Sequence, residues 1–291
     1  MTPKTSLDTF GTLSLIGMAL LLAFNQVVIA VGGDGWQPIF MAALRSIGAA
    51  CVLWLWLRWR GIPLVLARAQ WGTVTLMGLI FAVEFILLFT ALDLTSVGRA
   101  SVIFYAMPVW AALGARLFLG ERLTSQKLLG LALAFAGMAW AILGGASKAP
   151  GAILGDLCAL GASMGWAALL LFVKGSNIKA LPAEVQLFWQ VFLSIPLLVI
   201  AAVLSGPLVR ELTVISWAAL GFQVFAVASF GFLFWFWLIK IYPATSVASF
   251  SFLSPVFSVI LGVLLLGEEA GVGLIGALVL VTLGLILTNR G

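Results

Sequence analysis

Two charged side chains stand inside long apolar stretches, Arg45 in AALRSIGAA and Glu84 in a stretch that is otherwise uncharged from 71 to 92. Within a membrane such charges are costly and usually functional. At about 1.5 Å per helical residue, they lie roughly 10 and 12 Å from the same end of their helices, so they can meet. We expect either a binding site, in which Arg45 holds a carboxylate and Glu84 an ammonium or a proton, or a structural ion pair.

Two proline-containing helix faces carry further candidate residues. Ser101, Tyr105 and Pro108 share one face because their spacing is i, i+4 and i+7. Phe252 and Pro255 share another. Each proline removes a backbone hydrogen bond and tends to kink its helix. We therefore predict that Tyr105 and Phe252 line a cavity and that Pro108 and Pro255 are hinges, with plain scaffold as the alternative.

Aromatic and amide side chains within later apolar stretches complete the candidate set. Trp166, Gln190, Gln223 and Phe230 are of the types that bind an aromatic group beside an amide anchor. Helix packing is the alternative for Trp166. Arg99, near the end of the fourth apolar stretch, is expected to extend to the membrane interface rather than to pair with Asp93.

Other chemistry is not indicated. The chain has no histidine, and Cys51 and Cys158 belong to no CxxC pattern. Neither HExxH nor GxSxG occurs, so no catalytic residue, metal ligand or cofactor is predicted, and we expect no enzyme. The basic residues are scattered, which gives little support for nucleic-acid binding.

The composition places these residues in a membrane protein. Of 291 residues, 63% are apolar and 9% are charged, and the mean hydropathy is +1.22. In a soluble domain, about a quarter of the residues are charged. Because a spanning helix needs about 20 apolar residues, we predict an all-α integral membrane protein with ten transmembrane helices. The expected spans are 10–31, 38–57, 70–92, 96–118, 124–144, 153–173, 185–206, 213–238, 243–266 and 270–288.

The distribution of basic residues predicts the orientation. Ten of them fall at the termini or in the even-numbered loops: Lys4, Arg58, Arg60, Arg68, Arg122, Lys127, Lys174, Lys179, Lys240 and Arg290. Only Lys148 and Arg210 fall in the odd-numbered loops. Basic loops stay in the cytoplasm, so both termini are predicted to be cytoplasmic.

The sequence also contains an internal repeat. PVWAALGARLFLGE, from Pro108 to Glu121, resembles PVFSVILGVLLLGE, from Pro255 to Glu268, with an offset of 147 residues. We predict two five-helix repeats, residues 1–147 and 148–291. Since five is odd, the second repeat is inverted, as in many transporters. Glu121 and Glu268 are expected to cap the helix that follows each of them, and to contribute to gate closure.

These features resemble the drug/metabolite transporter superfamily of the EamA type. The resemblance rests on the ten spans, on the repeated Pro-Val and Leu-Gly-Glu, and on Arg45, Gly155-Asp156 and Trp166. The aromatic content is most similar to the YddG-type exporters of aromatic amino acids. The Trp-Gly usual in the first span of that family reads Phe24-Asn25 here, and Asn25 joins the candidate binding residues.

The resemblance implies a secondary transporter of the bacterial inner membrane that works by alternating access and without a cofactor. We expect export of small metabolites, above all aromatic or apolar amino acids, by a monomer that contacts only its substrate and the lipid bilayer. The alternative is proton-coupled export of lipophilic cations or drugs, with Glu84 as the counter-charge.

Overall fold

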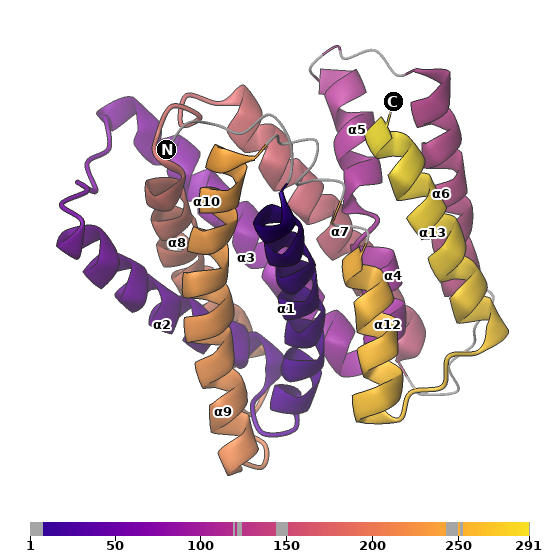
Figure 1. Cartoon of the computed structure of the whole chain (residues 1–291). Helices are drawn as coiled ribbons and strands as arrows, with labels where there is room; N and C mark the ends of the chain where they lie inside the picture. Colours follow the sequence, from indigo (N-terminus) through magenta and orange to yellow (C-terminus); the bar gives the residue numbers. More distant parts are fainter. Residues whose placement is uncertain are drawn as a thin grey trace.

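The chain folds almost entirely into helices, as Figure 1 shows. The computed structural model describes residues 8–118, 120, 124–143, 151–242, 250 and 253–290. In these residues the one β interaction is an isolated antiparallel bridge between Trp36 and Val209, which confirms the all-α class. The helices are α1 (Thr9–Gly33), α2 (Pro38–Trp59), η1 (Arg68–Gln70), α3 (Trp71–Leu94), α4 (Val97–Phe104), α5 (Met107–Phe118), α6 (Ser125–Leu143), α7 (Ala152–Gly175), α8 (Ala183–Leu204), α9 (Val214–Phe222), η2 (Gln223–Gly231), α10 (Phe232–Ile241), α12 (Leu253–Leu266) and α13 (Val272–Arg290).

Most of these helices are long and apolar enough to cross a membrane. Among the described residues, 8 helical stretches meet that condition, and two shorter apolar helices follow at Leu253–Leu266 and Val272–Thr288. They overlap the predicted spans, although part of the ninth span, 243–266, lies outside the described residues. The membrane class is confirmed, while the count of ten crossings stays a prediction.

The fourth apolar stretch is interrupted between α4 and α5. The break lies at Tyr105 and Ala106, and Pro108 is the second residue of α5. The Ala106 N–H donates to the Ile103 carbonyl at 3.3 Å, and the Val109 N–H donates to the Ala106 carbonyl at 2.9 Å. These short-range bonds tighten the turn before a proline that has no N–H of its own. The interruption thus lies where a kink is predicted, and the hinge role of Pro108 stays a prediction.

Helices α6 and α13 pack backbone to backbone through small residues. A Cβ added at Gly130 would lie 2.7 Å from the Gly284 carbonyl oxygen, and one at Gly137 would lie 2.8 Å from that of Ala277. The earlier glycine of α6 faces the later residue of α13, so the two helices are antiparallel. The offset of 147 relates Gly130 to Ala277 and Gly137 to Gly284. Gly130 therefore contacts the counterpart of Gly137, and Gly137 contacts the counterpart of Gly130, so the repeat relates the two contacts to each other.

The two repeated motifs also end alike. Gly120 follows α5 with φ +68°, and Gly267 follows α12 with φ +67°. A left-handed residue after a helix is usually glycine, because a side chain is strained there. The matching glycines of the sequence repeat thus have matching backbone conformations.

A second glycine-lined contact, between α3 and α7, brings candidate residues together. Gly155 packs against Thr95, Gly161 against Leu87, and a Cβ at Gly165 would lie 3.3 Å from the Cβ of Glu84. In lipid such small residues allow close helix approach. The antiparallel α3–α7 contact therefore places Glu84 beside the residue that precedes Trp166.

Candidate functional site

A single cavity contains most of the candidate residues. It has a volume of about 410 Å³, and residues from both sequence halves line it. The predicted residues in its wall are Asn25, Arg45, Glu84, Tyr105, Pro108, Trp166 and Gln190. Helices α1, α2, α3, α5, α7 and α8 and the break between α4 and α5 supply them, so packing of distant segments creates the site. Their binding role itself stays a prediction.

Arg45 and Glu84 are the two charges of the cavity wall. They are 3% and 1% exposed, and they lie close enough to attract each other. The Nε of Arg45 and the Oε2 of Glu84 are buried and have no hydrogen-bond partner among the described residues. The guanidinium instead lies 4.6 Å from the centre of the Phe85 ring. Buried charges normally have hydrogen-bond partners, so this pair has unused capacity for a charged ligand.

Tyr105 connects the two halves of the chain at the cavity. Its hydroxyl lies close to the side chains of Gln26 in α1 and Ser254 in α12, and all three residues line the cavity. The carbonyl oxygen of Gln26 has no partner in the described part of the chain. Our sequence analysis missed Gln26, although the adjacent amides Asn25 and Gln26 in an apolar stretch were a signal.

The rest of the wall is largely aromatic and aliphatic. Phe81 and Phe85 come from α3, Phe104 from α4, and Phe232 and Trp235 from α10. Aromatic faces bind flat apolar groups. The cavity therefore offers two opposite charges and three amides, those of Asn25, Gln26 and Gln190, beside a large apolar surface.

Three of the remaining candidates, Gln223, Phe230 and Pro255, do not line the cavity. Gln223 is fully buried, and its amide nitrogen lies 3.4 Å from the sulfur of Met41. Phe230 is 61% exposed on the outer surface and stacks on Phe234. Pro255 is buried in the first turn of α12. Phe252 lies outside the described residues.

The end of the molecule at Glu268 is closed by charged contacts. The backbone N–H groups of Val97 and Gly98 donate to the Glu268 carboxylate at 2.6 and 2.9 Å. The prediction that Glu268 caps the following helix is therefore wrong, since the carboxylate caps the start of α4 instead. Glu121 lies outside the described residues.

Two ion pairs strengthen this closed end. Arg99 is buried and forms a salt bridge with Asp156 of α7, so the expectation that it extends to the interface is wrong. Arg210 pairs with Asp93 at 2.5 and 2.8 Å and donates to the Gly33 carbonyl at 2.8 Å. The hydrogen bond with Asp93 raises the pKa of Arg210. Both pairs join residues of the first half to residues of the second.

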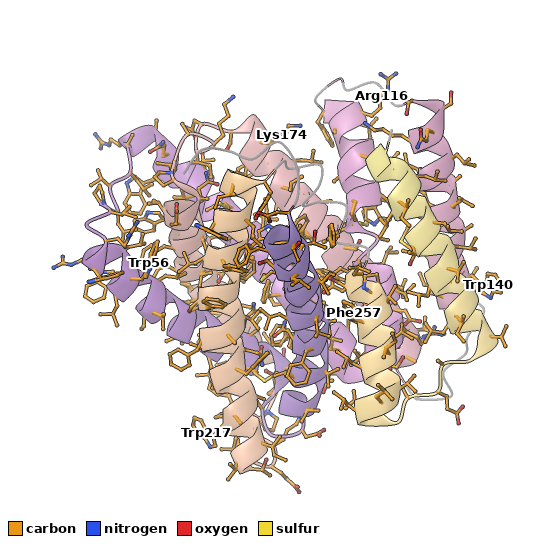
Figure 2. The ribbon with its side chains drawn as sticks, in the orientation of Figure 1. Trp56, Arg116, Trp140, Lys174, Trp217 and Phe257 are labelled. Carbon is orange, nitrogen blue, oxygen red and sulfur yellow. The ribbon has the colours of Figure 1, made fainter. Side chains whose placement is uncertain are left out.

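The cavity lies away from that closed end. It is lined by the first half of α1, from Leu15, by the second half of α7, to Leu170, and by Ser254 near the start of α12. Helix α1 begins and α13 ends at this same end of the bundle (Figure 1). Figure 2 shows Arg116 and Lys174 there, and Trp217 at the opposite end.

Comparison with known proteins gives a consistent family match. The model of the EamA-like transporter family matches residues 9–143 and again residues 153–290. The "Probable amino-acid metabolite efflux pump" of Salmonella typhimurium (strain LT2) is 30% identical and covers 97% of this chain and 95% of its own length. The protein of the same name in Escherichia coli (strain K12) is 28% identical over 94% and 92%.

Two further matches agree. The "Uncharacterized transporter YvbV" of Bacillus subtilis (strain 168) is 27% identical and covers 93% of this chain and 91% of its own length. A solved structure described as "Crystal structure of protein" covers 96% of both chains, with a TM-score of 0.67 and 22% identity. At that identity the solved structure supports the fold alone.

Proposed function

The chain belongs to the EamA-like transporter family, and from this premise we propose that it exports amino acids with aromatic or apolar side chains by alternating access. It is a multi-pass protein of the inner membrane, and transport, not catalysis, is the activity that the family indicates. The relatives named as amino-acid metabolite efflux pumps support an amino-acid cargo. YddG-type preference for aromatic amino acids is part of the proposal.

The observation that carries the proposal is the pair Arg45 and Glu84 in the wall of a mainly apolar cavity. An amino acid carries one carboxylate and one ammonium. Arg45 would bind the carboxylate, since guanidinium groups suit carboxylates, and Glu84 would bind the ammonium. The side chain of the cargo would then lie against Trp166 and the neighbouring aromatic rings.

The transport mechanism rests on the inverted repeat. We propose ten crossings with both termini in the cytoplasm, and repeats 1–147 and 148–291 that rock against each other. Helices α6 and α13 pack antiparallel through two contacts that the repeat relates to each other, which supports this arrangement. The basic residues Arg116 and Lys174 at the end where α1 begins support the orientation (Figure 2). We propose that a monomer is sufficient, with Pro108 and Pro255 as hinges.

A second candidate function is export of lipophilic cations coupled to protons. The buried carboxylate of Glu84 in an apolar cavity favours it. In that mechanism Glu84 binds cargo and proton in turn, and Arg45 is only a structural neighbour. The two functions predict different cargo and a different response to a pH gradient.

Transport by the purified protein in proteoliposomes tests the two functions. We would load radiolabelled tryptophan, threonine and a lipophilic cation in parallel vesicles, with and without a pH gradient, and use empty liposomes as the control. Tryptophan efflux above the control, faster than threonine efflux, is expected. Gradient-driven efflux of the cation without amino-acid efflux would replace the first function by the second.

A further inference from the structure

We infer that Glu268 is a latch that holds the outer gate closed, and that this contact favours the state of the transporter that faces the cytoplasm. The inference rests on the inverted repeat and on the orientation proposed above. It does not depend on the cargo.

The contact that carries the inference joins the two halves of the chain. Both carboxylate oxygens of Glu268 are used, one by the Val97 N–H at 2.6 Å and one by the Gly98 N–H at 2.9 Å. The next N–H of α4, that of Arg99, donates to the hydroxyl of Ser96 at 3.2 Å. The first N–H groups of a helix have no partner within the helix, and an anion is favourable there. Separating α12 from α4 would leave two of these donors without their acceptor.

Two glycines provide the space for the carboxylate. A Cβ at Gly262 would lie 2.5 Å from a Glu268 carboxylate oxygen, and one at Gly98 would lie 3.3 Å from it. Gly267 has φ +67°, and the Glu268 N–H donates to the Gly262 carbonyl at 3.1 Å. This turn folds the side chain back across α12 toward α4. The latch therefore needs glycine at 262 and is best served by glycine at 98.

The repeat does not supply these glycines at the other end. The offset of 147 relates Glu268 to Glu121, but it relates Gly262 to Ala115 and Gly98 to Thr245. If a carboxylate lay against Ala115 as that of Glu268 lies against Gly262, the Cβ of Ala115 would be 2.5 Å from a carboxylate oxygen. Packed atoms do not approach each other so closely. The sequence of the inner end thus disfavours an equal latch.

Since alternating access requires one end to close as the other opens, the Glu268 contact shifts the population toward the state with the outer end closed.

Thiol labelling measures the opening of the outer gate directly. We would replace Cys51 and Cys158 by alanine and introduce Ser258→Cys, one turn closer to Glu268 than the cavity residue Ser254. Ser258 is fully buried. A membrane-impermeant maleimide is then added to intact cells, and the labelling rate of the full-length protein is measured.

Two variants disrupt the latch in different ways. Glu268→Gln removes the charge, and Gly262→Ala puts a methyl group where the carboxylate lies. Because a hydrogen bond to a charged group contributes about tenfold or more to an equilibrium, each variant should label about tenfold faster or more. Glu269→Gln is the matched control, since Glu269 is exposed beside the latch, and its rate should equal that of the parent.

The outcomes separate the latch from a structural cap and from the proposed function. If both latch variants label at the parent rate, the contact is only a structural cap and the inference is wrong. If Glu268→Gln does not fold, the rate of Gly262→Ala decides. Faster labelling of the variants supports the latch even if no cargo is transported in proteoliposomes, which would contradict the proposed cargo alone.

Discussion

At the scale of single residues, Glu84 separates the two proposed cargo classes. Glu84→Gln keeps the size of the side chain and removes its charge. We expect the KM for tryptophan efflux to rise about tenfold, because one charge-assisted hydrogen bond to the cargo is lost, while efflux remains measurable through Arg45 and the apolar wall. The measurement is concentration-dependent efflux from proteoliposomes.

The matched control is Gln223→Met, which changes a buried amide that does not line the cavity and should leave the KM unchanged. An unchanged KM in Glu84→Gln, together with a lower melting temperature, would make Arg45 and Glu84 a structural pair. Complete loss of cation transport in the same variant would favour the cation exporter.

The two ion pairs of the closed end predict different stabilities. Asp156 is fully buried against Arg99, while Asp93 and Arg210 are partly exposed. Removing one partner of a buried pair costs about 3–5 kcal/mol, whereas an exposed pair contributes about 0–1 kcal/mol. We expect Asp156→Asn to lower the melting temperature in detergent far more than Asp93→Asn. Equal effects would show that burial does not determine the strength of these contacts.

Residue types were predictable from the sequence, but their partners were not. Arg45 and Glu84 stand out because a charge in an apolar stretch is rare. The partner of Glu268 lies 171 residues away along the chain, so a rule that looks to the following helix could not find it. Arg99 was misjudged for the same reason, because Asp156 reaches it only through the packing of α4 on α7.

At the scale of helices, the α6–α13 contact predicts a strong dependence on glycine. In Gly137→Ala the new methyl group would lie 2.8 Å from the Ala277 carbonyl oxygen, and overpacking of this kind costs about 1–3 kcal/mol. Gly17→Ala is the control, since no atom lies within 4 Å of its added Cβ. We expect a lower melting temperature for the first variant only. A similar decrease in both would mean that helix flexibility, not packing, sets the stability.

Helix positions were easier to predict than helix irregularities. Apolar runs of about 20 residues locate the spans, and α1, α2 and α3 begin and end close to the predicted limits. The face that each helix turns to the cavity depends on its neighbours. Phe230 therefore lies on the outer surface although its residue type suited the site, and the π-helical turns of η2 (Gln223–Gly231) had no signal in the sequence.

At the scale of the whole molecule, the repeat was visible in the sequence because the paired motifs keep a constant offset. The two copies of the motif are not identical, and the inference about Glu268 rests on one of the positions at which they differ. Gly262 in one motif and Ala115 in the other occupy related positions, and a Cβ added at Gly262 would lie 2.5 Å from a Glu268 carboxylate oxygen. Two copies of one motif can therefore close the two ends with unequal strength.

The orientation of the molecule is the last prediction, and it determines which end is called outer. Lys179 and Glu211 are both exposed, in the α7–α8 and α8–α9 connections. In a background without Cys51 and Cys158, we expect Glu211→Cys to react with an impermeant maleimide in intact cells, and Lys179→Cys to react only after permeabilisation. Basic loops remain cytoplasmic because their translocation is disfavoured, and Lys174 is a second basic residue near this connection, in the last turn of α7. The reverse labelling pattern would place Glu268 at the cytoplasmic end, and the latch would then hold the resting transporter open to the outside.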